Sequence, residues 1–388
     1  MIHVYGLSES AQEKVATATR IAADTATPNA DDVDREGRFP TESMKALADA
    51  GFYGLCLPLE VGGKGEGMRS FAGVVEELAG ACGSTAMVYV MHIAATQTIA
   101  ASTTLADREL LLKEIASGNH LTTLAFSETG SRSQFWAPVS RLEANNGHYV
   151  TSASKSWVTA AGHADSYVST GQKPGAASPL ESTVYLVHTK AKGVQITSVF
   201  NGLGLRGNDS RPVTLEKITV SRSDLISQPG EGPKVILQIA LPWFAVGSAA
   251  MANGLSRAAL QRTAQHLIGT EFAHDRSRLR DLPTLRARLA QMSVRTEASR
   301  SLLGYTLDHL EQASDVAPLL VLQSRLAALE AAVEVTDLAM KACGGAAFSR
   351  HLGIERVFRD ARAGWVMAPT VDHLNDFIGK ALTGLPLF

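Results

Sequence analysis

The sequence predicts a multidomain α+β protein, with an N-terminal α-helical domain, a middle antiparallel β sandwich or barrel, and a C-terminal four-helix bundle. Two observations predict this order. The chain has 388 residues, too many for one compact core. The spacing of apolar residues is helical in residues 1–120, becomes that of short strands in 121–228, and is helical again in 229–388. We place the domain boundaries at these two changes.

The amino-acid composition of the chain excludes several classes of protein. The hydrophobic fraction of 45% and the charged fraction of 19% are those of a globular chain. A net charge of −2 lacks the basic excess that binding to nucleic acid needs, and the uninterrupted apolar runs are too short for a membrane span. Cys56, Cys82 and Cys343 are scattered and odd in number. They predict neither a metal site nor a disulfide framework, which is typical of a cytoplasmic protein.

The N-terminal domain is predicted to contain one helix that is apolar almost all round. It includes Met91, His92 and Ile93, and such a helix is usually buried. A histidine on an apolar helix is more often a satisfied core residue than a functional one. Histidine is also the side chain that exchanges protons near neutral pH, so His92 stays a candidate for catalysis.

The middle domain is predicted from short runs rich in Val, Thr and Tyr, without helices between them. Asn146-Gly147 is a favoured hairpin turn. An all-antiparallel sandwich or barrel follows from this pattern. The predicted strands are 139–144, 148–159, 182–189, 193–200 and 212–221.

The C-terminal domain is predicted to be a bundle because its apolar residues follow the helical period over long stretches. The helix after Val316 carries Leu322, Leu326 and Leu329 near one stripe. The predicted helices are 235–268, 284–312, 316–342 and 370–382.

The stretch from Leu124 to Thr159 is the candidate binding site. Its first part is small, hydroxylated and rich in turns, so that N–H groups and hydroxyls can converge on a flat polar ligand. In its second part Trp157 and Thr159 are two residues apart, on one face of a strand. A flavin ring, which is stacked and hydrogen-bonded at once, suits this combination. An ordinary hairpin with a half-buried tryptophan explains the same residues.

Five segments, in order along nearly the whole chain, resemble the acyl-CoA dehydrogenase family. Each one alone is a weak signal, but their order and distances make the set specific. They are Ala125–Ser133 (Ala-Phe-Ser-Glu-Thr-Gly-Ser-Arg-Ser), Lys155–Thr159 (Lys-Ser-Trp-Val-Thr), Gly204–Ser210 (Gly-Leu-Arg-Gly-Asn-Asp-Ser), Cys343–Ala346 (Cys-Gly-Gly-Ala) and Arg356–Arg362 (Arg-Val-Phe-Arg-Asp-Ala-Arg).

The resemblance implies a flavin enzyme, with FAD favoured over FMN. It also implies a homodimer or homotetramer, because the family shares each flavin between subunits. Hydroxyls of strands and turns, and an ordinary helix end at Gly344-Gly345, are the structural alternatives. The implied cofactor contacts are the main chain of Phe126 and Ser127 at the ring edge, Ser133 at the diphosphate, Trp157 over the ring, Thr159 and Thr370 near the ring, and Gly344 and Gly345 beside the ADP part of a neighbouring subunit's cofactor.

The sequence departs from the family where the catalytic base is expected. The family removes a proton next to the thioester carbonyl with a glutamate, and our alignment places Ala368 and Phe244 at its two alternative positions. Neither side chain can accept a proton. His92 and Asp372 are the candidates to replace the base, although Asp372 also suits the first turn of a helix.

The sequence therefore predicts an FAD-dependent oxidoreductase of acyl-CoA dehydrogenase type, acting on the CH–CH group of an acyl-CoA or related thioester, with an electron acceptor or oxygen as second partner. A flavin-dependent monooxygenase of the same fold and a non-catalytic flavoprotein are the alternatives.

Overall fold

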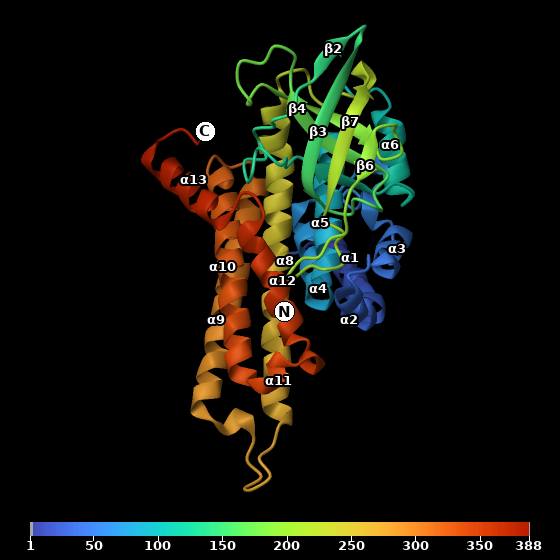
Figure 1. Ribbon diagram of the computed structural model, residues 1–388. Helices are drawn as coiled ribbons and strands as arrows, with labels where there is room; N and C mark the ends of the chain where they lie inside the picture. The colour runs from blue at the N-terminus through green and yellow to red at the C-terminus, as the bar shows by residue number, and fades with distance from the viewer. Residues whose placement is uncertain (1–2, 388) are drawn as a thin grey trace.

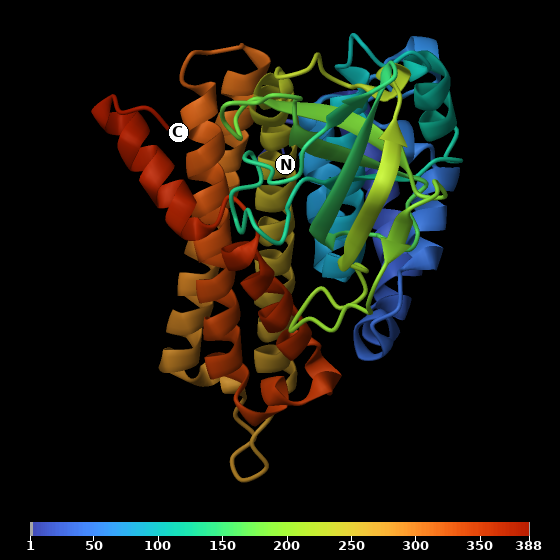
Figure 2. The same ribbon diagram turned by 45° about the horizontal axis from the view of Figure 1, so that its top comes forward.

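The structure is a computed structural model, which describes residues 3–387. It has a helical N-terminal part, a middle β part and a C-terminal column of long helices (Figure 1). Turned forward, the β strands lie in front of the N-terminal helices, with the long helices beside both (Figure 2). This order of helices, strands and helices confirms the predicted fold class.

The N-terminal part is built around α5, the apolar helix predicted from the sequence. Almost all of its eighteen residues are buried, including His92 and the apolar residues around it. Gly51 adopts the left-handed conformation and ends α3, as glycine commonly does. The helices are α1 (Glu9–Ile21), α2 (Thr27–Glu36), α3 (Thr41–Asp49), α4 (Met68–Ala81), α5 (Gly83–Ala100) and α6 (Arg108–Ala116).

The middle part contains two sheets, with strand orders β1-β4-β5 and β2-β3-β7-β6. Asn146 and Gly147 both have positive φ in the predicted hairpin turn. The prediction of an all-antiparallel domain was wrong in one place, because β1 and β4 pair in parallel. Both strands are buried along their whole length and show no alternation of polar and apolar residues, so the pattern missed them. The strands are β1 (Thr122–Ala125), β2 (Glu143–Asn145), β3 (His148–Val158), β4 (Ser166–Gln172), β5 (Ser182–His188), β6 (Val194–Ile196) and β7 (Arg211–Val220).

The C-terminal part is a bundle in which α8, α9, α10 and α12 pack together. The segment that contains α12 was predicted only as a signature, not as a helix. The predicted fourth helix, 370–382, is α13, which leans away from the top of the column (Figure 1). The helices are α7 (Gly232–Val235), α8 (Leu241–Gly269), α9 (Pro283–Glu311), α10 (Ala317–Cys343), α11 (Gly345–Phe348), α12 (Ile354–Val366) and α13 (Val371–Thr383).

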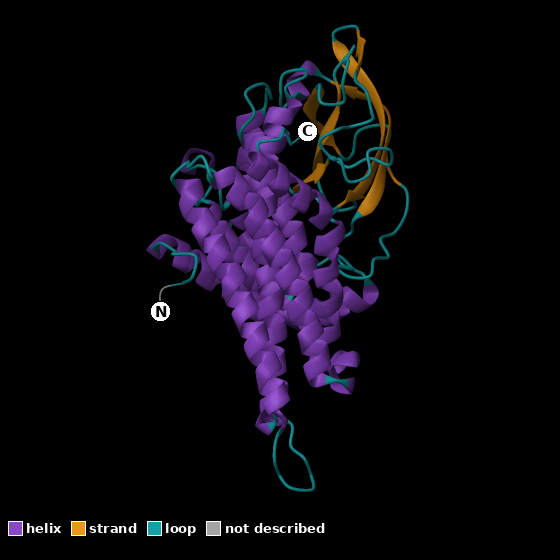
Figure 3. Cartoon of the chain, turned by 90° about the vertical axis from the view of Figure 1, so that its left-hand side faces the viewer, coloured by secondary structure: helices purple, strands orange, loops and turns teal. Residues whose placement is uncertain are grey.

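One hydrophobic core joins the N-terminal helices to the bundle, and a second core lies inside the β part. Side on, the helices form a continuous column with the strands on one flank (Figure 3). The continuous helix over Gly232–Gly269 is long and apolar enough to cross a membrane by composition alone. Because 61% of its apolar window is buried within the protein, its apolarity is that of a core helix.

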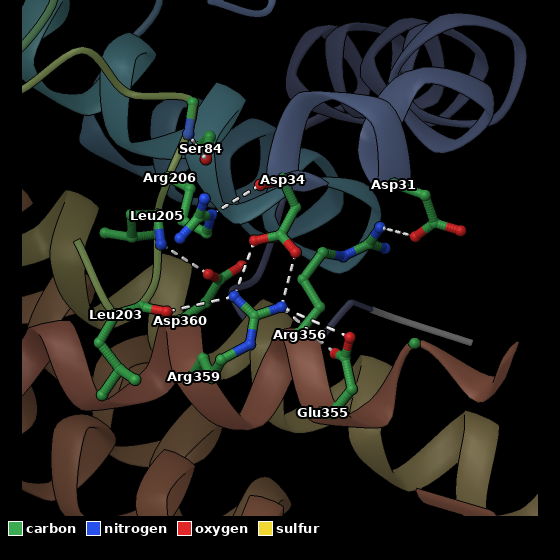
Figure 4. Close-up of polar contacts among 12 residues, drawn as sticks. Asp31, Asp34, Ser84, Leu203, Leu205, Arg206, Glu355, Arg356, Arg359 and Asp360 are labelled. Carbon is green, nitrogen blue, oxygen red and sulfur yellow. Dashed lines mark hydrogen bonds and ion pairs between the residues drawn. The ribbon is translucent and has the colours of Figure 1, made fainter. Parts of the chain in front are cut away.

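The three parts meet at α12 (Figure 4). The Arg359 guanidinium donates to both carboxylate oxygens of Asp34 on α2, at 2.8 and 2.6 Å, and to the carbonyl of Leu203 at 3.2 Å. The neighbouring Asp360 accepts a 2.6 Å hydrogen bond from the N–H of Leu205. Burial raises the pKa of Asp360 to about 6, although the Leu205 N–H and Arg356 favour its ionised form. These bonds fix the loop of residues 203–207 between the N-terminal helices and the bundle.

Replacing Arg359 with methionine leaves the Asp34 carboxylate largely buried without its partner. We expect the free energy of unfolding to fall by about 3 kcal/mol in urea denaturation. Arg295→Met is the matched control, because its partner Glu334 and Arg295 itself are 56% and 44% exposed, and its cost should stay below about 1 kcal/mol. Equal losses in the two variants would show that the junction does not hold the domains together.

Candidate active site

A cavity of about 1240 Å³ lies where the β part, α5 and the bundle meet. Most of the predicted cofactor contacts line it. The lining residues used below are Met87 and Met91 of α5, Phe126, Ser127, Glu128 and Ser133 after β1, Trp157 and Thr159 at the end of β3, Leu203 and Leu205, Phe244 of α8, Arg359 of α12, and Met367 and Ala368 before α13.

The loop after β1 is held to the sheet by a buried ion pair. The Lys155 ammonium lies 2.7 Å from Glu128 Oε1 and donates to the carbonyl of Thr170 at 2.7 Å. Glu128 also accepts from the N–H groups of Val139 and Ser140 and from the Ser140 hydroxyl, at 2.7, 2.8 and 2.5 Å. The loop that carries Ser127 is thereby anchored to the sheet.

The same contacts set the charge of Glu128. Burial opposes ionisation of the carboxyl, but Lys155 and the two donors of Ser140 outweigh it and lower its pKa. Glu128 is the one carboxylate among the described residues that line the cavity, and that part of the wall holds no histidine. An ionised carboxylate with four such contacts is not free to take a proton from a ligand.

Trp157 and Thr159 line the cavity beside this loop. The prediction that both lie on one face of a strand was wrong, because β3 ends at Val158. The pairing of β3 with β7 is irregular between Lys155 and Val158, and Trp157 has φ of 57°. A tryptophan with positive φ is uncommon and strained. Trp157 is 69% exposed in the single chain and lines the cavity, so its indole is accessible to a ligand there. Thr159 is buried, and its hydroxyl lies 3.1 Å from that of Ser210.

The opposite wall is formed by Phe244, Met367 and Ala368. Behind them lies Arg325 of α10, whose side chain is fully buried. Its Nε donates to the Ser248 hydroxyl at 2.9 Å, and its two terminal nitrogens donate to the carbonyls of Pro369 and Met367 at 2.7 and 3.0 Å. Its guanidinium carbon is 4.8 Å from the centre of the Phe244 ring.

Arg325 has no carboxylate partner among the described residues. Burial alone lowers its pKa, to about 9, so the guanidinium is cationic at neutral pH. By contrast, buried Lys155 is paired with Glu128. A buried cation without a counter-ion is costly and is compensated here by two carbonyls, a hydroxyl and an aromatic face. Sequence reasoning missed it, although Arg325 interrupts the apolar stripe between Leu322 and Leu329, which is the signal that was available.

The structure does not place His92 or Asp372 in the cavity. His92 is fully buried; its Nδ1 is 3.2 Å from the N–H of Thr122, and its Nε2 is 3.2 Å from the carbonyl of Tyr53. Both ring nitrogens are therefore used by the core. Asp372 is exposed in the first turn of α13. The candidate base roles of both residues are corrected to structural ones, because neither reaches the cavity wall.

The remaining predicted contacts lie outside this cavity. The Thr370 hydroxyl caps α13 by accepting from the N–H of His373. Gly344 and Gly345 are exposed at the end of α10, and a Cβ added to either would meet no atom within 4 Å. Gly344 has φ of 54° and ψ of −133°, a conformation that glycine adopts readily. The glycines thus have open space in front of them, and the single chain fills none of it.

Comparison with known proteins identifies the family. Three family models match: the N-terminal domain of acyl-CoA dehydrogenase over residues 8–119, its middle domain over 123–218 and its C-terminal domain over 230–382. The chain belongs to the acyl-CoA dehydrogenase family, whose members are FAD-dependent oxidoreductases acting on CH–CH groups.

Individual relatives are distant but span the chain. A probable acyl-CoA dehydrogenase of Bacillus subtilis is 27% identical over 86% of this chain and 88% of its own length. The acryloyl-CoA reductase (NADH) of Anaerotignum propionicum is 26% identical over 86% of this chain and 84% of its own. The butyryl-CoA dehydrogenase structure from Megasphaera elsdenii has a TM-score of 0.92, with 20% identity, over 97% of this chain and 99% of that one. At that identity the structure supports the fold alone.

From the burial of His92 we predict how the stability of the folded protein changes at acidic pH. Burial lowers the pKa of His92 from its usual 6.5 to about 4, although contacts of the ring with the carbonyls of Tyr53 and Thr122 raise it. The unfolded chain therefore takes up the proton first as pH falls, and the folded protein loses stability between about pH 6.5 and pH 4. We expect this loss to be of order 3 kcal/mol.

His92→Gln keeps one donor and one acceptor without a titrating ring, so its free energy of unfolding should fall less over the same pH range. Urea denaturation of both proteins across that range measures the difference. Parallel pH profiles would show that His92 does not titrate on unfolding.

Proposed function

We propose that this protein binds FAD in the cavity and exchanges a hydride between the flavin and an acyl-CoA, without a carboxylate on the cavity wall as proton acceptor. The observation that carries the proposal is the composition of that wall. It offers hydroxyls and an exposed indole for the cofactor, and its one carboxylate, Glu128, is held by Lys155.

The residues present fit FAD. The hydroxyls of Ser127 and Ser133 make no hydrogen bond to another residue in the range 3–387 and lie on the cavity wall, so they are free to bind a polar ligand. Trp157 would cover one face of the ring, and Thr159 and the main chain near Phe126 would bond its edge. When bound, FAD supplies a two-electron hydride acceptor. The protein's part is to bind the acyl chain beside it and to exclude water.

A backbone N–H is available for the substrate carbonyl. The peptide between Met367 and Ala368 is trans, so its N–H points opposite to its carbonyl. The Met367 carbonyl accepts from Arg325, and the Ala368 N–H therefore points away from Arg325. That N–H has no acceptor within residues 3–387, and Ala368 lines the cavity. We assign it to the thioester oxygen, where negative charge develops when the adjacent proton leaves.

The side chain of Ala368 leaves the cavity wall without a carboxylate at this position. Ala368 and Phe244 occupy the positions that our alignment gives to the family's glutamate. Both line the cavity within one cluster with Met367. An alanine and a phenylalanine leave this end of the cavity apolar, so proton transfer at the α carbon must use water or a hydroxyl.

The exposed Gly344 and Gly345 support a shared cofactor. We propose that a neighbouring subunit places the ADP part of its FAD over them, in a homodimer or homotetramer. The open space in front of both glycines is the observation behind this assignment.

Reconstitution with FAD tests the cofactor. We expect the purified protein to bind FAD, and Trp157→Ala to weaken binding by about tenfold, because one stacked aromatic face is lost. Tyr305→Ala is the control, since Tyr305 is an exposed aromatic residue on α9 outside the cavity wall. A wild-type protein that takes up no FAD would contradict the proposed function.

Anaerobic mixing with saturated and with α,β-unsaturated acyl-CoAs tests the reaction. Bleaching of the oxidised flavin by the former, or return of its colour from the reduced state with the latter, is the expected result. A product that forms only with oxygen would instead establish a monooxygenase. The absence of any reaction in FAD-loaded protein would establish a non-catalytic flavoprotein.

Restoring a carboxylate tests the assignment of Ala368. We expect Ala368→Glu to raise the rate of anaerobic flavin bleaching by saturated acyl-CoAs by about a hundredfold or more. Ala368→Gln has the same shape but cannot act as a base, and it should show no gain. Equal rates in the two variants would show that residue 368 does not face the α carbon.

A further inference from the structure

The peptide group between Met367 and Ala368 connects Arg325 to the cavity: its carbonyl accepts a hydrogen bond from the Arg325 guanidinium, and its N–H is that of Ala368. Arg325 donates to the Met367 carbonyl at 3.0 Å and to the Pro369 carbonyl at 2.7 Å. It thus holds the carbonyls on both sides of Ala368 and turns both away from the cavity. The third bond, from Nε to Ser248 on α8, fixes the guanidinium plane itself.

These contacts do more than fix the loop. A charged donor on a carbonyl polarises the whole peptide, because the C=O and the N–H are conjugated. The N–H of Ala368 is therefore a stronger donor than an ordinary amide. No carboxylate among the described residues pairs with the Arg325 guanidinium. The Phe244 ring and the loop of residues 367–369 lie between this cation and the cavity. Water therefore does not screen the electric field of Arg325 in that region.

We propose that Arg325 is a positioning residue for the reaction: through the Met367–Ala368 peptide it stabilises negative charge on a carbonyl oxygen bound in the cavity. This role rests on the proposed function and adds to it a residue that does not touch the substrate. The ligand it favours is an acyl thioester in its enolate form, with the oxygen on the Ala368 N–H.

The test uses a 3-oxoacyl-CoA such as acetoacetyl-CoA, which ionises to an enolate with a distinct ultraviolet absorbance. The FAD-loaded wild-type protein should bind it and lower the pKa of the ligand. In Arg325→Met, which has a similar length but no charge, the pKa of the bound ligand should rise by about 1 or more. Arg325→Lys keeps the charge and should recover part of the effect.

A merely structural role would change melting temperature without changing the ionisation of the bound ligand. Folding and FAD content of each variant are therefore checked first, and Arg325→Lys carries the test if Arg325→Met does not fold. A ligand that ionises equally in wild type and in folded, FAD-loaded variants would overturn the role of Arg325 alone. A wild-type protein that binds FAD but no acyl-CoA would overturn this role and the proposed function together.

Discussion

The architecture depends on the bidentate ion pair between Arg359 and Asp34, together with the bond from Leu205 to Asp360. These contacts lie on consecutive residues of α12 and reach two other domains. Helix α12 packs on α8 and α10, so the loop of residues 203–207 is fixed relative to the bundle. Leu203, Leu205 and Arg359 then form part of the cavity wall. The junction thus fixes one part of the cavity wall relative to the bundle.

Electrostatics gives the two sides of the cavity different roles. On the β side, the charge of Glu128 is balanced by Lys155 and by backbone donors, so this carboxylate is held in place and its charge is largely neutralised. On the bundle side, Arg325 is a buried cation that carbonyls and an aromatic ring compensate only in part. A buried cation without a carboxylate partner favours a reaction in which negative charge forms nearby. Among the described residues of the wall the one carboxylate, Glu128, is held by Lys155.

Much of this could be predicted from the sequence, because local patterns determine the elements. The long apolar periods predicted α8, α9 and α10, and two of the five signature segments contain Ser127, Ser133, Trp157 and Thr159, which line the cavity. The pattern of polar and apolar residues failed to predict strands and side-chain roles at completely buried positions. Strands β1 and β4 show no alternation, and a residue such as His92 looks functional until the core contacts on both ring nitrogens are seen. The sequence shows that Arg325 interrupts the apolar stripe of α10, but two of its three partners are main-chain carbonyls, which no residue type in the sequence indicates.

The central claim is that flavin and acyl chain share a cavity whose wall offers no proton-accepting carboxylate. The most direct measurement is a crystal structure of the protein with FAD and an acyl-CoA that cannot react. The account predicts the ring against Trp157, the thioester oxygen on the Ala368 N–H, and no carboxylate oxygen within about 3.2 Å of the α carbon or one water away from it. A glutamate or aspartate found at that carbon, from this chain or from a neighbouring subunit, would contradict it.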